Sequence, residues 1–380
     1  MSENNLNIQM VDLKSQYMKI KPQVDQAIND VLSSTQFING EHVKSFQNEL
    51  AAYLDVKHVI TCANGTDALQ ISMMALGLKA GDEIITPSFT YIATTEVIGL
   101  LGLKPVFVDC NPENFNISVD EVEKAITKKT KAIVPVHLFG QSSDMKSIMS
   151  LAKKYNLFVI EDNAQAIGSD YLGFNQPQKT GTIGNIGCTS FFPSKNLGCF
   201  GDGGAMMTND DELAKKLRMI ANHGQSKRYY HDIVGCNSRL DNIQAAVLRI
   251  KLKELDQYIL NRQKAANYYD QNLKNLDQLT LPFRNLDSNH VFHQYTLKLD
   301  DSIVRDELIQ YLAEKNIPAM VYYPVPAHRQ KMFSKIPNSY GNMKVTNWLS
   351  SRVFSLPMHT ELSTLQQDYI IENISNFLNK

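Results

Sequence analysis

Lys195 is the residue whose surroundings most clearly suggest chemistry. The apolar, strand-like run Cys188–Phe192 stops at Pro193, and several glycines between Gly198 and Gly204 follow the lysine. Proline has no N–H and a fixed φ, so it ends strand pairing, whereas glycines allow a sharp turn and a close backbone approach. This pattern predicts a lysine held at the tip of a strand, where its amine could form a Schiff base with a carbonyl group. An ordinary surface lysine is the alternative interpretation of this stretch alone.

A second stretch has the residues of a phosphate site. Gly65 and Thr66 follow the apolar run 58–62, at a position where a helix would begin. The first N–H groups of a helix are unpaired and lie at the positive end of its dipole, so they can bind phosphate. The hydroxyls of Thr66 and Ser190 are further candidate donors. An ordinary helix cap at Asn64 or Thr66 is the alternative.

A carboxylate ends another apolar run. Asp162 follows Phe158–Ile160, and an acid at a strand's end can pair with a protonated pyridine nitrogen. Because side chains alternate along a strand, Glu161 is expected to point to the opposite face. Alone, Asp162 would more often be a helix cap or a turn residue. A phosphate seat, a pyridinium partner and an amine on one sheet are together what pyridoxal phosphate (PLP) requires.

Seven apolar runs alternate with helical stretches and are predicted to form one sheet. Most are apolar on both faces, which is typical of a largely parallel sheet covered by helices on both sides. Ligands of such sheets bind beyond the carboxyl ends of the strands, where the polar groups above are found. No GxGxxG or GxxxxGK[ST] motif is present, which disfavours nicotinamide and P-loop nucleotide sites. The predicted strands are His58–Cys62, Glu83–Pro87, Pro105–Asp109, Ala132–His137, Phe158–Asp162, Thr189–Phe192 and Ala205–Thr208.

Helical spacing of apolar residues is found around and between these runs. It predicts a helix from about Pro22 to Ser34, a second helix after Gly40 and a crossover helix within Ser142–Tyr155. A long helical region follows the last predicted strand, over roughly residues 240–273. These helices supply the covering layers that the sheet needs.

The character of the chain changes toward its C-terminal end. The alternating run Phe292–Leu299 and a helix at about 304–315 predict a smaller α+β domain. We therefore expect a PLP-binding large domain, with a short N-terminal segment, over residues 1–255. The small C-terminal domain is expected over residues 256–380.

Composition excludes several classes of protein. The chain has 380 residues, 43% of them hydrophobic, and is long enough for a large and a smaller domain. Its net charge of -1 gives no sign of a basic surface that would bind nucleic acid or an anionic membrane. The five scattered cysteines form no CxxC or Cys/His cluster, so neither a disulfide framework nor a metal site is expected. The polar Met1–Asn5 and the lack of any apolar run of ~18 residues predict a cytoplasmic protein.

At this point the sequence resembles the DegT/DnrJ/StrS family of PLP-dependent nucleotide-sugar aminotransferases, which have fold type I. The resemblance implies a seven-stranded, mostly parallel sheet in the large domain, with the strand at Ala205–Thr208 antiparallel. It also implies a homodimer with PLP between the subunits. The stretches that carry it are Ala63–Leu69, Thr86–Tyr91, Ile160–Gln165, Ser190–Lys195, Gly201–Ala205, Asn222–Gly224 and Asn237–Asp241.

The same resemblance implies a role for individual residues. Lys195 matches the family's Schiff-base lysine, and Asp162 matches the partner of the pyridine nitrogen. Gln165 is similar to the contact with the ring hydroxyl, and Tyr91 to the aromatic side chain that stacks on the ring. The residues that match phosphate binders are Gly65, Thr66, Ser190 and, from the neighbouring subunit, Asn237.

Within the family, the sequence is most similar to transaminases that install the 3-amino group of a UDP-linked 2-acetamido-glucuronic acid, a precursor of bacterial surface polysaccharide such as O-antigen. Glutamate is the amino donor that this likeness implies. Near the sugar the family commonly has His-Tyr-Pro, whereas this chain has Tyr322-Tyr323-Pro324, which leaves the contact at Tyr322 open. Candidate cations for the diphosphate or the uronate are Arg228, Arg239, His328 and Arg329.

Four other functions compete with this one. A C4 aminotransferase, or one for a dTDP- or GDP-sugar, would share the same motifs. A PLP sugar dehydratase of this fold has histidine in place of the lysine, but Lys195 is present. The intact set of Asp162, Lys195 and the phosphate seat argues against a non-catalytic, PLP-binding regulatory protein. An NAD-dependent oxidoreductase would need a glycine fingerprint, which this sequence lacks. If Lys195 works as a general acid and base, the pKa of its free amine should be lowered.

Overall fold

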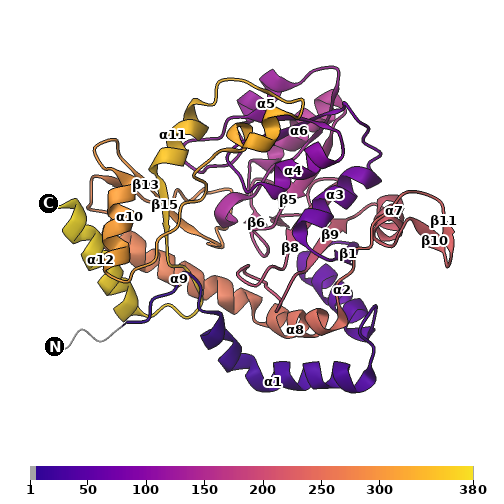
Figure 1. The fold of residues 1–380 in the computed structure, drawn as a ribbon, viewed down its shortest axis with the longest axis horizontal. Coiled ribbons are helices and arrows are strands. Elements are labelled where there is room, and N and C mark those ends of the chain that lie inside the picture. The colour runs from indigo at the N-terminus through magenta and orange to yellow at the C-terminus, as the bar shows by residue number, and fades with distance from the viewer. Residues whose placement is uncertain (1–5, 380) are drawn as a thin grey trace.

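The apolar runs of the first half of the chain form the strands of one central sheet (Figure 1). The computed structural model describes residues 6–379, so the polar Met1–Asn5 lie outside the described part. Each of the seven predicted runs overlaps a strand. The strands are β1 His58–Cys62, β2 Glu83–Pro87, β3 Lys104–Val108, β4 Thr130–Ile133, β5 Phe158–Asp162, β8 Ile186–Ser190 and β9 Gly204–Thr208.

The sheet has the predicted direction of strands but one strand more than expected. Its order is β1-β9-β8-β5-β4-β2-β3-β14, and β9 pairs antiparallel with both β1 and β8. The antiparallel strand implied by the family resemblance is therefore confirmed. The prediction of seven strands was one short, because β14 (Ser339–Tyr340) joins the edge of the sheet in parallel with β3. Two residues far along the chain are too short a run for periodicity to reveal.

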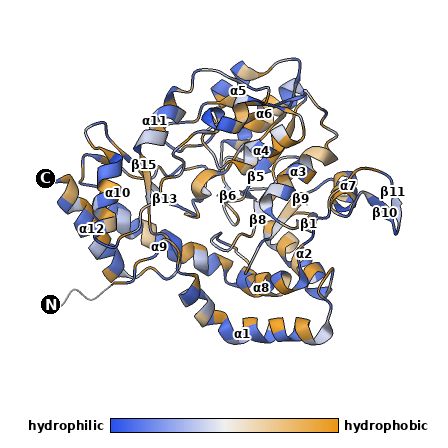
Figure 2. Cartoon of the chain, viewed as in Figure 1, coloured by the Kyte–Doolittle hydropathy of each residue, from blue (hydrophilic) through white to orange (hydrophobic). Residues whose placement is uncertain are grey.

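Alternation along the strands buries both faces of the sheet. Ile84 of β2 and Ile160 of β5 belong to the apolar cluster that also includes α3 (Gly65–Ala75) and α7 (Asp211–Ala221). Their neighbours Ile85 and Val159 belong to a different cluster, formed with α5 (Val119–Ala125) and α6 (Met145–Tyr155). Helices therefore cover opposite faces, as the apolar runs predicted. The covering helices change between hydrophobic and hydrophilic colours along their length, as amphipathic helices do (Figure 2).

Four sequence-based boundaries were wrong, the first at β4, which ends at Ile133 and not at His137. Helix α1 spans Leu13–Ser34 with Pro22 inside it, because Asp12 caps its start by accepting a hydrogen bond from the N–H of Ser15 at 2.9 Å. The long helical region is two helices, α8 (Asn242–Lys253) and α9 (Leu255–Leu273), which meet at Glu254. Strand β8 ends at Ser190, and Phe191 and Phe192 lie outside it, since no pairing continues into Pro193.

The C-terminal part of the chain builds a second apolar cluster. A small sheet of β12 (Leu279–Thr280), β13 (Tyr295–Leu299) and β15 (Val353–Leu356) packs with α9, α10 (Arg305–Glu314) and α12 (Thr364–Leu378). Ile8, close to the start of the described chain, belongs to the same cluster. The division into domains at residue 255 stays a prediction.

The remaining elements connect the central sheet with the C-terminal cluster or extend from them. Within residues 6–379, no helix combines the length and the apolar character needed to cross a bilayer. The expected cytoplasmic location stays a prediction. The other elements are α2 Glu41–Leu54, α4 Ala93–Leu100, α11 Lys344–Arg352, β6 Asp170–Tyr171, β7 Gln178–Lys179, β10 Gln225–Lys227, β11 Tyr230–His231 and the short turns η1 Leu138–Gly140, η2 Ala327–Arg329 and η3 Lys331–Ser334.

Candidate active site

The predicted phosphate residues come together where β1, β8 and β9 meet the start of α3. Gly204 pairs with Cys62 of β1 on one side and with Ser190 of β8 on the other. A Cβ atom added at Gly65 would lie 2.7 Å from Cβ of Ser190, and one added at Gly204 would lie 2.4 Å from the carbonyl carbon of Asn64. Only glycine fits at either position, because real Cβ contacts are not that short.

This glycine-lined corner suits a phosphate group. The side chain of Asn64 caps α3 by accepting a hydrogen bond from Asp67 N at 2.8 Å, so the helix begins at Gly65. The N–H groups of Gly65 and Thr66 have no acceptor within the helix, as at every helix start. The positive end of the helix dipole and the hydroxyl of Ser190 lie at the same corner. The donor set therefore fits the phosphate of PLP.

Lys195 lies in the turn that follows β8. Its N–H donates to the carbonyl of Phe192 at 2.8 Å, which fixes the turn just past Pro193. Burial lowers the pKa of its amine to about 8, and the nearby carboxylate of Asp162 acts in the opposite direction. The expected lowering of this pKa is confirmed. Such an amine is partly uncharged near neutral pH, as a nucleophile or base must be.

Asp162 and Glu161 point to opposite faces of β5, as strand alternation predicted. Asp162 is buried and accepts hydrogen bonds from Thr94 Oγ1 at 2.7 Å and from Ala164 N at 3.1 Å. Glu161 is fully buried beside His137 Nε2 at 2.9 Å and also accepts from the N–H groups of Gly181, Ile183 and Gly184. The carboxylate of Glu161 therefore holds the loop at residues 181–184. Asp162 lies on the face of the strand that is nearer to Lys195.

Gln165 and two tyrosines extend the site beyond Asp162. Gln165 Oε1 accepts from Phe139 N at 2.7 Å, and its Nε2 donates to the hydroxyl of Tyr323 at 2.9 Å. Burial raises the pKa of Tyr323, so its phenol stays protonated. The ring of Tyr91 is 58% exposed and its centroid lies 6.1 Å from that of Tyr323. An exposed ring at this edge is free to cover a planar ligand.

Tyr322 and His328, which were expected near the sugar, each contact a different part of the chain. The phenol of Tyr322 hydrogen-bonds to the amide of Gln294, and burial raises its pKa. His328 Nδ1 lies 2.7 Å from Ser88 Oγ, on the stretch that leads to Tyr91. His328 was expected as a cation, but burial and the charge of Arg329 lower its pKa, so it is neutral at pH 7.

Arg239 and Asn237 flank Ser238, which is hydrogen-bonded to residues at the start of α3. Ser238 Oγ donates to Asp67 Oδ2 at 2.6 Å and accepts from Ala63 N at 2.9 Å. Arg239 is partly buried and Asn237 is exposed. The segment therefore runs beside the phosphate corner of its own chain.

Arg228 lies apart from these residues within the chain. It belongs to the β10–β11 region beside α7, at the right edge of Figure 1, where its guanidinium lies over the ring of Tyr229. Its expected contact with substrate stays a prediction. The roles assigned to the other site residues from sequence also stay predictions.

Sequence reasoning missed several residues that build the site. Thr94 holds Asp162, Phe139 holds Gln165, Ser238 ties its segment to α3, and Gln294 contacts Tyr322. Each comes from a part of the chain far from its partner, so no local pattern connects them. Two sequence signals were available: the motif Thr86–Tyr91 ends three residues before Thr94, and the motif Asn237–Asp241 contains Ser238.

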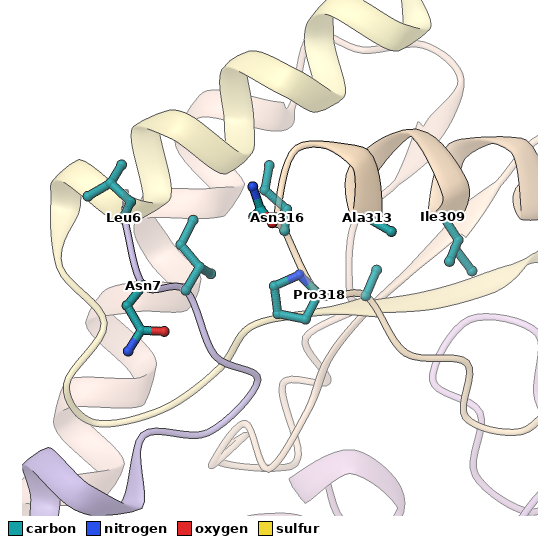
Figure 3. Close-up of a pocket in the computed structure, with 9 residues that line it drawn as sticks. Leu6, Asn7, Ile309, Ala313, Asn316 and Pro318 are labelled. Carbon is teal, nitrogen blue, oxygen red and sulfur yellow. The ribbon is translucent and has the colours of Figure 1, made fainter. Parts of the chain in front are cut away.

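A cavity of about 710 Å³ lies elsewhere, between the N-terminal segment and α10 (Figure 3). Its lining is mostly apolar and includes no titratable side chain and none of the predicted site residues. It is therefore not the place where Lys195 acts. The cavity is lined by Leu6, Asn7, Ile8, Ile309, Ala313, Asn316, Ile317, Pro318 and Ala319.

A lysine of lowered pKa, a buried carboxylate and a phosphate corner on one α/β sheet are typical of enzymes that use PLP. The chain belongs to the DegT/DnrJ/EryC1/StrS aminotransferase family, which matches residues 18–375. The family, the fold and the aminotransferase class expected from sequence are thereby confirmed.

Individual relatives match almost the whole chain. A protein of Geobacillus stearothermophilus, named "Pleiotropic regulatory protein", is 45% identical over 98% of this chain and 99% of its own length. The UDP-2-acetamido-2-deoxy-3-oxo-D-glucuronate aminotransferase of Pseudomonas aeruginosa is 44% identical over 97% of this chain and all of its own. Other relatives, 36% to 40% identical, are named as dTDP-amino-sugar transaminases or GDP-perosamine synthase.

Solved structures agree with this assignment. An aminotransferase of the same family from Brucella abortus is 40% identical, with a TM-score of 0.93, covering 98% of this chain and 100% of that one. NtdA of Bacillus subtilis, solved with bound cofactor PMP, is 30% identical, with a TM-score of 0.89, covering 100% of this chain and 87% of that one. PMP is the amino form of PLP, and the expected cofactor is confirmed.

Proposed function

We propose that the protein transfers an amino group from L-glutamate to C3 of UDP-2-acetamido-2-deoxy-3-keto-D-glucuronic acid, for a bacterial surface polysaccharide such as O-antigen. The observation that carries aminotransfer is Lys195, whose amine has a pKa of about 8 beside the carboxylate of Asp162. The 44% identity to the Pseudomonas aeruginosa enzyme supports a UDP-linked 3-keto sugar, and a relative named for UDP-N-acetyl-3-dehydro-alpha-D-glucosamine is equally similar. The likeness of residues 188–195 and 223–239 to the UDP-uronate transaminases supports the uronate.

Each site residue has a definite task in this proposal. PLP, when bound, supplies the aldehyde that joins amines and a ring that takes up electrons. With the cofactor bound, Lys195 would hold its aldehyde and, as a free amine, would carry the proton between the α-carbon of the donor and C4′. Asp162 holds the proton on the pyridine nitrogen. Thr94 keeps the carboxylate of Asp162 in place.

The remaining residues position the reactants. Gly65 and Thr66 offer N–H groups to the phosphate, and Ser190 offers its hydroxyl. Gln165 faces the ring hydroxyl, and Tyr91 covers the ring. Arg239, with Tyr322 and Tyr323, contacts the sugar nucleotide.

The nucleotide and the ring carbon have competing candidates. Relatives named for dTDP- and GDP-linked sugars are 36% to 40% identical, against 44% for the UDP-uronate enzyme. Mass spectrometry of turnover on the 3-keto UDP-uronate with glutamate tests the proposal directly. A gain of one amino group at C3 supports it. Turnover of a 4-keto or dTDP-linked sugar alone would contradict it.

A non-catalytic role is the second candidate, and one observation favours it. The relative at 45% identity is named as a regulatory protein rather than an enzyme. A regulatory protein would keep PLP without turnover. An absorbance spectrum therefore shows whether the cofactor is bound, and turnover measured on a panel of keto-sugars shows whether the protein is catalytic. Cofactor absorbance that never changes with any donor or keto-sugar would favour regulation.

We also propose a homodimer in which each site uses both chains. The stretch around β10 and β11 leaves several apolar and aromatic side chains on the surface. Tyr229 is 76% exposed and Val234 is 83% exposed. Exposed apolar groups gathered in one place are typical of a surface that a partner covers. Arg228 lies on the same stretch, so a second chain could bring it to a site.

A further inference from the structure

Asn116 is a buried asparagine whose amide is hydrogen-bonded entirely to one short turn. The residue is 2% exposed and lies between β3 and α5. Its Nδ2 donates to the carbonyls of Gln141 at 3.1 Å and Ser142 at 2.9 Å, and its Oδ1 accepts from Leu138 N at 3.0 Å. These bonds enclose the η1 turn from both ends. None of the tasks proposed above uses Asn116, although a fully paired buried amide strongly constrains the backbone that it holds.

The turn that Asn116 encloses has a backbone conformation that few residues adopt. Phe139 has φ 58° and ψ 4°, in the left-handed region, which is uncommon for a bulky residue. Its ring is buried and packs against Phe89 and Phe115, with ring centroids 6.4 Å and 5.4 Å away. A residue in a sparsely populated region stays there only when its surroundings hold it, and such residues are concentrated at active sites. The bonds of Asn116 on either side of Phe139 supply that constraint.

The conformation of the turn sets the direction in which the N–H of Phe139 points. That N–H donates to Oε1 of Gln165 at 2.7 Å. A backbone N–H can only donate, so the oxygen end of the Gln165 amide has to face it. Nε2 is then the other end of the amide, and it donates to the hydroxyl of Tyr323 at 2.9 Å. The turn therefore decides which end of Gln165 is presented to the site.

One hydrogen of Gln165 Nε2 is left without a partner. An amide nitrogen has two hydrogens, and the bond to Tyr323 uses one of them. Within residues 6–379 no acceptor is found for the other, although Gln165 is only 7% exposed. Buried donors are nearly always paired, so this one indicates an acceptor that a ligand brings. The ring oxygen of PLP is such an acceptor, and the donor present here fits it.

We propose that Asn116 is a positioning residue for the cofactor: by holding the η1 turn, it fixes the amide of Gln165 so that an N–H, and not the oxygen, meets the ring oxygen of PLP. The inference rests on the proposed role of Gln165. A donor at that oxygen stabilises negative charge on it. It therefore lowers the pKa of the proton that the oxygen shares with the nitrogen of Lys195 when lysine and cofactor are bonded.

Replacing Asn116 by alanine tests the constraint, and a second buried asparagine is the matched control. Nδ2 of Asn373 donates to the carbonyl of Tyr369 at 2.8 Å, but this residue lies on α12, in the C-terminal cluster. The full-length protein is loaded with PLP, and its visible absorbance is measured against pH. We expect the midpoint to rise by about 1 pH unit in Asn116→Ala, because a hydrogen bond to a charged group is lost. Asn373→Ala should keep the wild-type midpoint, and thermal melting shows whether both variants are folded.

Gln165→Ala separates this inference from the role of Gln165 itself. This variant should raise the midpoint at least as far, and adding Asn116→Ala to it should change nothing more. A raised midpoint in Gln165→Ala with a wild-type midpoint in Asn116→Ala would overturn the inference and leave the role of Gln165 standing. A further rise in the double variant would also overturn it. A wild-type midpoint in Gln165→Ala would contradict the proposed role of Gln165, and the inference would fall with it.

A measurement without cofactor reads the turn directly. In a crystal structure of unliganded Asn116→Ala we expect Phe139 to have left the left-handed region and its bond to Gln165 to be lost. An unchanged turn with that bond intact would contradict the proposal.

Gln165→Glu leaves the turn intact and covers the case in which Asn116→Ala does not fold. The ionised carboxylate can accept from Phe139 N and from the hydroxyl of Tyr323, but it has no hydrogen for the ring oxygen. We expect the absorbance midpoint to rise by about 1 pH unit or more. A wild-type midpoint would show that an oxygen of residue 165 already faces the cofactor, and it would overturn the proposal.

Discussion

Thr94 donates a hydrogen bond of 2.7 Å to Oδ2 of Asp162 and so joins the start of α4 to the end of β5. The other carboxylate oxygen accepts from Ala164 N at 3.1 Å. Because both oxygens have donors within the chain, the carboxylate is held in one orientation before any ligand binds. A fixed carboxylate can hold a proton on a pyridine nitrogen without first having to rotate, which is the advantage of a preorganised site.

Asp162→Asn removes this charge while nearly preserving shape. We predict a loss of turnover on the order of 10²-fold or more, because the pyridine nitrogen would no longer stay protonated. Single-turnover absorbance measurements with glutamate locate the loss in the proton-transfer step. Glu161→Gln is the matched control on the opposite face, and it should lower stability while folded molecules keep their rate. An effect of Asp162→Asn confined to KM for the sugar would show another role.

The lysine that bonds the cofactor can be distinguished from a second lysine with a similar pKa. Burial lowers the pKa of both Lys195 and Lys251 to about 8, but Lys251 lies on α8, near the ring of Phe200. We predict that borohydride fixes the cofactor to Lys195 alone, as peptide mass spectrometry would detect. Lys195→Ala should abolish transamination, whereas Lys251→Met should keep it. Wild-type-like turnover by Lys195→Ala would contradict the assignment.

Local chemistry made part of this site predictable from sequence. The ends of apolar runs located Gly65, Asp162 and Ser190, since parallel strands present their carboxyl ends at one edge. Alternation separated Asp162 from Glu161 without any knowledge of the fold. These inferences depend on residues a few positions apart.

What the sequence could not supply depends on contacts across long stretches of chain. Thr94 reaches Asp162 over 68 positions, and the paired Gln165 and Tyr323 are 158 positions apart. Pro22 was taken as the start of a helix, but the cap at Asp12 starts it earlier. Packing and capping outweighed a local signal there, and nothing local marks β14 as a strand.

The rate of transamination should depend on the charge of Lys195. Starting from the pyridoxamine form with the keto-sugar, the lysine is free, and below its pKa of about 8 it is mostly protonated and cannot accept a proton. The single-turnover rate should therefore rise about tenfold per pH unit below that value and level off above it. Lys251→Met should leave the profile unchanged. A rate that is flat from pH 6 to 9 would exclude Lys195 as the base.

Substrate preference should follow the uronate group. A charge-assisted contact between Arg239 and the sugar carboxylate would contribute ~1.5–3 kcal/mol, which is roughly 10- to 150-fold in kcat/KM. We predict that the 3-keto-glucuronate nucleotide is preferred by that margin over its 6-hydroxymethyl counterpart. Arg239→Gln should remove most of the preference, with little effect on the uncharged sugar. Equal efficiency of the wild-type enzyme with both sugars would refute a uronate-specific site.

The last prediction is that each active site is shared between two subunits. Ser238 attaches the Asn237–Arg239 segment to the start of α3, yet Asn237 itself is exposed and so could meet a second chain. If it does, each dimer holds two equivalent sites built from both chains. Lys195→Ala would spoil the site of its own subunit, and changing Asn237 and Arg239 together to alanine would spoil the partner's. When the two inactive proteins exchange subunits, a heterodimer has one site with both defects and one intact site, so activity should return. If mass spectrometry confirms exchange between inactive parents and no activity is regained, the site lies within one chain.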